Sequence, residues 1–389
     1  MKSDTPATFP TGKPVGVQPS KIPLAAKVII TVFLAILIPT YLHTYGPTNF
    51  LWFCDAALIL TVAGMWLESS LLISMCAVGI LLPQCLWLAD FGSNLLGFHF
   101  LNLTGYMFDP HLPLFTRGLS LFHGWLPMLL IWLLFRLGYV RTTDIPYGDD
   151  LRQKLDVYLP QKMAANAKVV IFFYGGAWRD GSKTDYRFVA QALTSRGFIV
   201  VLPDYRLYPQ VTFPSFVEDG ASAVRWVRDH ISTYGGDTNH VYLMGHSAGS
   251  RIAALLTLDA QYLKAVGLDR NVIRATATLS GPYDFTPNPW DRPVFSMRNN
   301  ETAINPNIEP ITFVDGKEPP MLLVQGLRDK IVAPSNAVNL VARIRQAGGE
   351  VDYITYPKRG HASVVVALAS PYHWLAPVLK DVTDFFDRH

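Results

Sequence analysis

The hydrophobic residues of this chain follow two different patterns, which change near residue 140. Before that point they form long stretches with few interruptions, whereas after it short apolar runs of strand length alternate with amphipathic segments. An apolar stretch of about 20 residues is long enough to cross a bilayer as a helix, and regular alternation of strands and helices is typical of an α/β fold. The pattern therefore predicts an all-α transmembrane domain over residues 24–140, followed by an α/β domain over residues 141–389.

The N-terminal part begins with a polar tail. Residues 1–23 are rich in Pro, Thr and Lys and show no hydrophobic periodicity, which predicts a disordered segment. About four transmembrane helices are predicted after it, of which the second and third are close to the minimum length for a span: 24–45, 50–67, 71–88 and 119–137. As an interfacial aromatic belt requires, tryptophans lie near the ends of these stretches: Trp52, Trp66, Trp87 and Trp125.

Two ionisable residues, Asp55 and His123, lie just inside the predicted spans. Ionisable groups within a membrane are costly and often functional, so the two residues are candidates for a polar pathway. Both also lie within about one turn of a span end, which fits snorkelling or packing against a neighbouring helix. The sequence leaves both interpretations open and favours the second.

Basic residues flank the first and last predicted spans. Three lysines precede the first span and Lys27 lies near its start. Three basic residues follow the last span and Arg136 lies at its end, whereas the connection over 91–118 contains only Arg117. Cytoplasmic flanks carry an excess of Lys and Arg, and four spans place both ends of the domain on one side. We therefore expect an integral, multi-pass membrane protein with a cytoplasmic C-terminal domain, although a miscount by one span would reverse this orientation.

The C-terminal part contains seven apolar runs of strand length: 155–159, 168–173, 198–202, 240–244, 275–279, 321–325 and 351–355. Most are continuous rather than alternating, as expected for strands buried on both faces of a parallel sheet. Segments of helical period lie between them: 186–195, 213–234, 250–260, 334–347 and 371–386. The alternation predicts a mostly parallel, doubly wound sheet, interrupted by a long connection or partial lid over 282–320.

Composition excludes two kinds of function. The net charge is only +3 and the basic residues form no cluster interleaved with aromatic residues, so nucleic-acid binding is not expected. The three cysteines lie in the apolar part without CxxC or Cys/His spacing, so we interpret them as small buried hydrophobic residues and expect no metal site.

A Gly-x-Ser-x-Gly pattern provides the first candidate for catalysis. In the stretch Gly245-His246-Ser247-Ala248-Gly249, an apolar run ends and a helical pattern begins. Such a strand, sharp turn and helix form a nucleophile elbow, with Ser247 exposed and the Ala248 N–H facing a developing oxyanion. Side chains at the two glycines would collide with the neighbouring strand and helix. We interpret His246 as a packing or substrate-adjacent residue whose ring points away from Ser247.

A serine nucleophile needs a base, and the base needs an orienting acid. His361 follows the last predicted strand and Asp329 the strand before it, which is the order expected after the nucleophile. Asp284 remains a rival acid and Asp315 a more distant one. Glycines in the stretch Tyr174-Gly175-Gly176-Ala177-Trp178 would let backbone N–H groups approach a substrate carbonyl closely, and Trp178 fits a core position equally well.

These motifs together resemble the esterase/lipase branch of the α/β-hydrolases, and most of all carboxylesterases of the prenylcysteine methylesterase and kynurenine formamidase kind. The similar pieces cover about 147–389 and include Gln153–Tyr158, Tyr174–Trp178, Pro203–Arg206, Gly235–Asp237, Gly245–Gly249, Ser280–Asp284, Gly326–Asp329 and Gly360–His361.

The resemblance implies an α/β-hydrolase fold, a Ser247–His361–Asp329 triad and an oxyanion hole made by the N–H groups of Gly175, Gly176 and Ala248. Two residues depart from the family pattern, which usually has histidine at Tyr174 and often a third glycine at Ala177. Neither change removes an N–H donor. They make the substrate harder to predict than the chemistry, and we expect Tyr174, Ala177 and Trp178 to lie next to the substrate.

We therefore expect a membrane-anchored serine carboxylesterase that needs no cofactor and acts on an amphipathic or lipid-like ester at the surface of membrane lipid. An amidase, formamidase or O-deacetylase with the same triad is an alternative. A non-catalytic membrane scaffold is a third possibility, and the presence of all three triad residues speaks against it. The sequence predicts neither the acyl length nor the oligomeric state.

Overall fold

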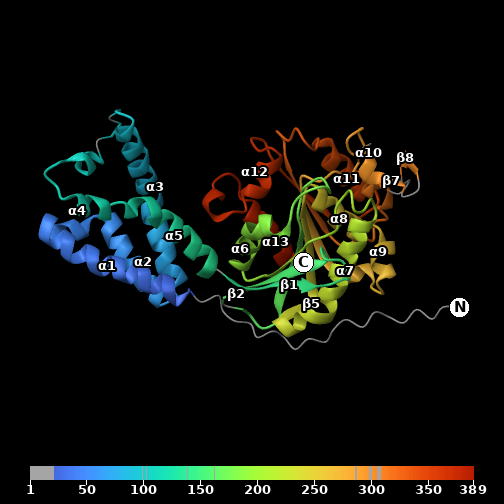
Figure 1. The fold of residues 1–389 in the computed structure, drawn as a ribbon. Coiled ribbons are helices and arrows are strands. Elements are labelled where there is room, and N and C mark those ends of the chain that lie inside the picture. The colour runs from blue at the N-terminus through green and yellow to red at the C-terminus, as the bar shows by residue number, and fades with distance from the viewer. Residues whose placement is uncertain are drawn as a thin grey trace. The chain divides into compact units, whose positions relative to one another are not determined.

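The computed structural model describes residues 22–98, 100–101, 103–137, 139–161, 163–284, 287–297, 300–304 and 308–389. It divides near residue 140 into two compact units, which are considered separately: a helical unit up to Val140 and an α/β unit from Arg141 (Figure 1). Most of the tail predicted over residues 1–23 lies outside the described residues.

The helical unit is built from five α-helices and two short 3₁₀ segments in the part of the chain described: α1 (Leu24–Tyr45), η1 (Pro47–Leu51), α2 (Phe53–Trp66), α3 (Ser70–Leu95), η2 (Gly105–Phe108), α4 (Leu114–Leu119) and α5 (Phe122–Leu137). Three helical stretches among the described residues are long and apolar enough to cross a membrane: Leu24–Tyr45, Leu72–Leu95 and Leu114–Leu134. Helix α2 has only 14 residues, or roughly 21 Å of rise. It is therefore shorter than the span expected over 50–67.

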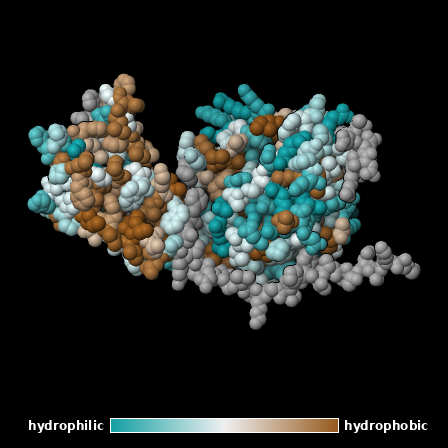
Figure 2. Space-filling view, in the orientation of Figure 1, coloured by the Kyte–Doolittle hydropathy of each residue, from teal (hydrophilic) through white to brown (hydrophobic). Residues whose placement is uncertain are grey.

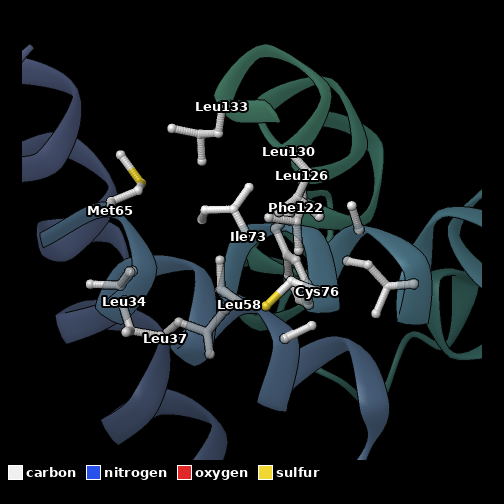
Figure 3. Packing of buried hydrophobic residues seen from close by; sticks show 14 of the residues in the cluster. Leu34, Leu37, Leu58, Met65, Ile73, Cys76, Phe122, Leu126, Leu130 and Leu133 are labelled. Atoms are coloured by element: carbon white, nitrogen blue, oxygen red, sulfur yellow. The ribbon is translucent and has the colours of Figure 1, made fainter. Parts of the chain in front are cut away.

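The helices pack around an apolar core inside the unit (Figure 3). Its fully buried members include Leu37 of α1, Leu58 of α2, Ile73 of α3, and Leu126 and Leu130 of α5. The outer surface is also apolar, as the brown areas of Figure 2 show, and it carries exposed residues such as Val78, Leu82 and Met128. Apolar residues on both the inside and the outside fit a bundle surrounded by hydrocarbon.

Side-chain contacts show that neighbouring helices run antiparallel. Lys27, near the start of α1, pairs with Glu68, just after α2, at 2.8 Å. Farther along α1, Phe33 packs on Trp125 and Tyr41 shares a hydrogen bond with Ser120, so α1 and α5 run in opposite directions. The start of α1 and the end of α5 therefore lie at the same end of the bundle.

The α/β unit contains an eight-stranded sheet in the order β1-β2-β4-β3-β5-β6-β9-β10. Strands β3, β4, β5, β6, β9 and β10 pair in parallel, whereas β2 pairs antiparallel with β4. The strands have these bounds: β1 (Tyr139–Pro146), β2 (Lys154–Pro160), β3 (Ala167–Phe173), β4 (Ile199–Pro203), β5 (Gly236–His246), β6 (Ile273–Leu279), β9 (Met321–Gly326) and β10 (Val351–Tyr356).

Helices cover both faces of this sheet. On one face, α8 and α11 share an apolar cluster with β9 that includes Ala254, Leu323 and Leu340. On the other face α13 packs against β5, where the rings of Phe386 and Tyr242 lie 4.6 Å apart. The helices of the unit are η3 (Lys183–Tyr186), α6 (Arg187–Thr194), α7 (Ser215–His230), η4 (Ile231–Tyr234), α8 (Ala248–Leu258), α9 (Ala260–Ala265), η5 (Arg270–Val272), α10 (Arg292–Phe295), η6 (Pro310–Phe313), α11 (Ser335–Gln346), α12 (His361–Val366), η7 (Ser370–Tyr372) and α13 (Val378–Arg388).

This architecture confirms the predicted α/β-hydrolase fold, and all seven predicted strands are present. Strand β1 was not predicted, because its residues alternate between partly buried and exposed positions and include several polar side chains. The 282–320 stretch, expected to be irregular, contains α10 and a two-stranded sheet of β7 (Ser296–Met297) and β8 (Asn300–Ile304).

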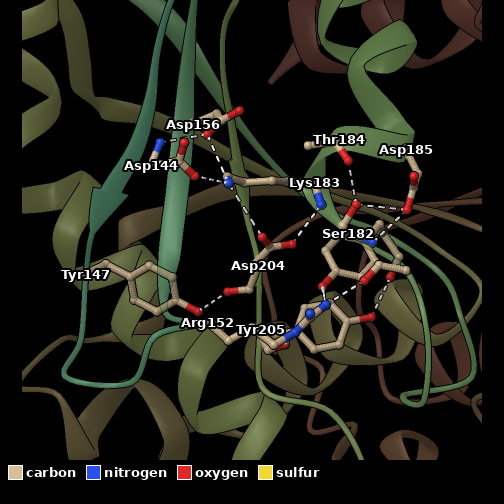
Figure 4. A network of polar contacts seen from close by, with 12 residues as sticks. Asp144, Tyr147, Arg152, Asp156, Ser182, Lys183, Thr184, Asp185, Asp204 and Tyr205 are labelled. Atoms are coloured by element: carbon tan, nitrogen blue, oxygen red, sulfur yellow. Dashed lines mark hydrogen bonds and ion pairs between the residues drawn. The ribbon is translucent and has the colours of Figure 1, made fainter.

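A buried lysine ties the start of the α/β unit to its sheet (Figure 4). The ammonium group of Lys183 lies 2.7 Å from Asp144, 3.3 Å from Asp156 and 3.5 Å from Asp204. Lys183 is 5% exposed and Asp156 is 1% exposed. Buried charges of this kind are tolerated when each is paired, so the network depends on the lysine.

Replacing Lys183 by Met should destabilise the α/β unit by about 3 kcal/mol, because it leaves the buried Asp156 carboxylate without its ammonium partner. The change is measurable by chemical denaturation of the detergent-solubilised full chain. Lys380→Met is the matched control, since Lys380 forms an exposed ion pair with Asp384 and should leave the unfolding midpoint unchanged. Equal effects of the two substitutions would contradict the role assigned to the Lys183 network.

Candidate active site

The candidate site lies where four parallel strands end. Gly175 follows β3, Ser247 follows β5, Asp329 follows β9 and His361 follows β10. Carboxyl ends of parallel strands share one edge of a sheet, where loops carry functional residues in α/β proteins. The order of the strands therefore brings together residues that are far apart in the sequence.

Ser247 occupies a strained turn between β5 and α8. Its backbone adopts φ 54° and ψ −121°, a region that non-glycine residues rarely occupy and that costs energy. Tight packing holds it there: a Cβ atom on Gly249 would lie 2.1 Å from the carbonyl oxygen of Phe173 in β3, and one on Gly245 would lie 2.4 Å from the carbonyl oxygen of Gly249. The collisions expected at both glycines are therefore confirmed.

Ser247, His361 and Asp329 form a continuous chain of hydrogen bonds. The Ser247 Oγ atom lies 2.8 Å from His361 Nε2, and His361 Nδ1 lies 2.8 Å from Asp329 Oδ2. A carboxylate can only accept, so His361 Nδ1 carries the proton of this second bond. That tautomer leaves Nε2 free to accept the hydroxyl proton of Ser247.

Asp329 is held ionised by the groups around it. Burial by itself would raise the pKa of this carboxyl group, but hydrogen bonds from His361 and from the backbone N–H groups of Val332 and Ile331 outweigh burial and lower it. The amide of Gln325 also donates to Asp329 Oδ2 at 3.2 Å. Gln325 was not predicted as a site residue, since a glutamine at the end of a strand has no distinctive sequence signal.

The two rival acids have other partners. Asp284 is exposed and accepts a hydrogen bond from Asn339 at 2.6 Å. Asp315 pairs with Arg270 at 2.8 Å. Neither interaction involves His361, so the geometry favours Asp329.

The predicted oxyanion loop lies directly beside Ser247. A Cβ atom on Gly175 would lie 3.0 Å from Ser247 Cβ, and one on Gly176, which has φ 140°, would lie 2.0 Å from the carbonyl oxygen of Asp180. Position 176 therefore requires glycine, and a side chain at position 175 would be tightly packed. Ala248 is the first residue of α8, so its N–H has no acceptor within the helix.

Tyr174, which replaces the usual histidine, braces this loop. Its ring stacks on Tyr205 at 4.5 Å, and its hydroxyl accepts a hydrogen bond from Arg152 at 2.8 Å. The hydroxyl of Tyr205 in turn donates to the backbone carbonyl of Tyr174 at 2.8 Å. Arg152 also binds the carbonyl of Gly181, across the loop. Arg152 and Tyr205 were not predicted to have this role.

His246 contacts the backbone of His361. Its Nε2 lies 3.2 Å from the backbone oxygen of His361, and its Nδ1 lies 3.0 Å from the hydroxyl of Tyr186. A carbonyl only accepts, so Nε2–H donates and Nδ1 accepts from Tyr186. Burial lowers the pKa of His246 to about 3, with a further contribution from the neighbouring His361. His246 is therefore neutral, and Tyr186 is a site residue that the sequence did not reveal.

A cavity of about 400 Å³ opens next to Ser247. Ala177 and Trp178 line it, together with Asn288, Trp290 and Asp291 from the 282–320 stretch. Ile331 and Val332, just after Asp329, complete an apolar wall. Tyr174 and His246 were expected beside the substrate but are not among the lining residues, because both side chains are buried in the contacts described above.

Within the part of the chain described, no group of three or more His, Cys, Asp or Glu side chains is placed to hold a metal ion. The groups gathered at Ser247 are a hydroxyl, an imidazole, a carboxylate and backbone N–H donors. Together they can perform nucleophilic attack and proton transfer.

Residues 155–344 match the model of the BD-FAE family. A probable isoprenylcysteine alpha-carbonyl methylesterase of Arabidopsis thaliana is 32% identical over 250 residues, which cover 58% of this chain and 52% of the relative. Esterase LipC of Mycobacterium tuberculosis is 31% identical over 245 residues, covering 57% of this chain and 60% of the relative. The chain thus spans about half to three-fifths of the length of these relatives.

Solved structures show the same fold. A truncated carbohydrate esterase from gut microbiota superimposes with a TM-score of 0.56 at 24% identity, covering 64% of this chain and 95% of that chain. A butyrate-bound esterase from Thermogutta terrifontis gives a TM-score of 0.53 at 21% identity, covering 64% and 93%. The α/β unit is therefore a BD-FAE domain of the α/β-hydrolase esterase family, homologous to isoprenylcysteine methylesterases and to mycobacterial esterases.

Proposed function

We propose that the chain is a membrane-anchored serine carboxylesterase. The observation that carries the proposal is the hydrogen-bond chain from Ser247 Oγ through His361 to Asp329, with both bonds at 2.8 Å. A domain that only binds a ligand has no need for this chain, for the strained turn at Ser247 and for adjacent N–H donors at the same place. Homology to named esterases supports the same reaction class.

The reaction begins with attack of Ser247 Oγ on the ester carbonyl carbon while His361 Nε2 takes the hydroxyl proton. The N–H groups of Gly175, Gly176 and Ala248 stabilise the oxyanion of the tetrahedral intermediate. His361 then gives its proton to the leaving alcohol as the ester C–O bond breaks, which leaves an acyl group on Ser247. Water activated by His361 releases the acid and restores the serine.

The cavity beside Ser247 supports an ester with an apolar portion as substrate. Trp178, Ile331 and Val332 offer apolar contact, while Asn288 and Asp291 are polar. The plant relatives are named as methylesterases of isoprenylcysteine, a substrate with a lipid-like part. An enzyme anchored at a bilayer meets such amphipathic esters at high local concentration, so we propose a lipid-soluble carboxylic ester.

Membrane anchoring by the helical unit is supported by its three long apolar helices and its apolar outer surface. The antiparallel packing of α1 with α5 returns the chain to the side from which it entered. The short helix α2 packs with seven of its 14 residues buried. Because basic residues flank both ends of the unit, we propose that the α/β unit is cytoplasmic.

Replacing Ser247 by Ala should lower kcat/KM for p-nitrophenyl esters by about 10⁴-fold or more, because no other group at the site can form the acyl-enzyme. Activity is measured with the detergent-solubilised full chain and an acyl series from acetate to decanoate. Ser222→Ala, on the surface of α7, serves as the control and should retain activity. Hydrolysis that survives Ser247→Ala would contradict the proposed nucleophile.

Replacing Asp329 by Asn should lower kcat by roughly 10⁴-fold, because an amide N–H in place of the carboxylate favours the wrong tautomer of His361. The lowered pKa of Asp329 keeps it ionised at neutral pH, so the substitution removes a real charge. Asp284→Asn is the matched control and should leave kcat within about twofold, since Asp284 is exposed and bonds Asn339 instead. The opposite ranking of the two variants would assign the acid to Asp284.

Accessibility of single cysteines tests the orientation in the membrane. The α/β unit has no native cysteine, so Ser222→Cys and Asp109→Cys can each be introduced after Cys54, Cys76 and Cys85 are replaced by Ala. In intact cells a membrane-impermeant maleimide should label Asp109→Cys, at the far end of the bundle, and should label Ser222→Cys only after permeabilisation. Labelling of Ser222→Cys in intact cells would place the α/β unit on the other side.

A further inference from the structure

A second cavity, of about 510 Å³, lies inside the helical unit. It is at the end of the bundle where α1 finishes and α2 and α5 begin, far from Leu24 and Leu137 along these helices. Its lining includes Tyr45 of α1, Asp55 of α2 and Gln84 of α3. The serine hydrolase mechanism uses none of these residues.

Several residues that line this cavity have polar atoms without partners. Among the described residues, Asp55 Oδ1, both amide atoms of Gln84 and the hydroxyl of Tyr45 have no hydrogen-bond partner in the protein. Gln84 is only 1% exposed and Asp55 only 4% exposed. Unpaired buried polar groups cost roughly 1–3 kcal/mol each, and an ionisable group within a membrane bundle is usually functional. Three helices thus converge on one unsatisfied polar centre.

The wall of the cavity is held in a fixed shape by a buried carboxylate. Asp90 of α3 accepts hydrogen bonds from the backbone N–H groups of Leu101 and Thr104, at 2.6 and 2.8 Å, and from the Thr104 hydroxyl at 2.8 Å. These bonds anchor the segment that supplies Leu103 and Tyr106 to the lining. Tyr106 also accepts a hydrogen bond from the indole of Trp87 at 3.2 Å. Hydrogen bonds within the protein therefore hold the wall of the cavity in place.

Aromatic rings surround the polar centre. Trp87 stacks on His123 at 4.7 Å and forms part of the wall. Trp52 and Phe53 also line the cavity but are each 68% exposed, so they mark its mouth. Aromatic faces attract cations, most strongly where water is excluded.

We propose that this cavity binds a small organic cation, a primary ammonium group attached to an apolar or aromatic moiety. The available carboxylate and amide oxygens accept hydrogen bonds from N–H donors, and the aromatic walls favour a positive charge. Asp55 forms no ion pair among the described residues, although its Oδ2 accepts a hydrogen bond from the amide of Asn49 at 3.1 Å. The basic Arg117 donates to the carbonyl of Met107 at 2.8 Å. An ammonium ligand would supply the missing countercharge.

Three compounds of the same shape separate this ligand class from its alternatives. Phenethylamine, 2-phenylethanol and phenylacetate are titrated into the full chain in nanodiscs at neutral pH, and tryptophan fluorescence reports binding at Trp52 and Trp87. Phenethylamine should bind saturably and at least tenfold more tightly than 2-phenylethanol, and phenylacetate should not bind. Equal affinities for the amine and the alcohol, or no saturable binding of the amine, would overturn the proposal.

Variants locate the binding at this cavity. Asp55→Asn should raise the Kd of phenethylamine at least tenfold and Gln84→Leu about threefold to tenfold. Trp52→Leu changes an exposed residue at the mouth, so folding is preserved, and it should weaken binding about threefold. Asp109→Asn, an acidic residue outside the cavity, is the matched control and should change nothing. Unaltered affinity in Asp55→Asn would overturn the site. Ser247→Ala should bind normally, which separates this proposal from the esterase.

Discussion

The close approach of the nucleophile turn to strand β3 is the constraint on which the active-site geometry depends. At Gly249 there is no room for a Cβ atom beside the Phe173 carbonyl, so the first turn of α8 packs directly against the end of β3. This contact holds Ser247 at its positive φ, directs its hydroxyl toward His361 and sets the N–H of Ala248 beside the loop that follows β3. Packing of the surrounding strands and helices offsets the conformational energy of the strained turn.

The loop that follows β3 is braced by a network of aromatic and polar side chains. The resemblance to esterases implies histidine at position 174, and a stacked tyrosine pair with an arginine supports the loop here. In the same unit, Lys183 forms ion pairs with Asp144 of β1 and Asp156 of β2 and so holds these two strands in place (Figure 4). Both devices use buried polar groups with their partners satisfied, which gives rigidity and direction that apolar packing alone does not provide.

Different interactions determine how the helices of the helical unit pack. Its outer side chains are apolar and its core is apolar as well, so contrast with solvent does not decide which helix face points inward. The specific contacts between helices are polar or aromatic, as in the bond between Tyr41 and Ser120. Such contacts fix the antiparallel order of the helices. One end of the bundle retains polar atoms without a hydrogen-bond partner among the described residues, which is the physical basis for the ligand that we propose.

Elements whose patterns are local can be predicted from the order of the residues. Continuous apolar runs predicted the seven main strands, long apolar stretches predicted the helices before residue 140, and the spacing of Gly245 and Gly249 indicated the sharp turn at Ser247. The folded structure was needed to show which carboxylate lies against His361, that Tyr186 contacts His246 and Gln325 contacts Asp329, and that a polar cavity forms between α1, α2 and α3. Strand β1 also became evident only in the sheet. The reason is that burial and periodicity act between near neighbours in the chain, whereas a contact between distant loops depends on strand order, helix packing and the orientation of each side chain.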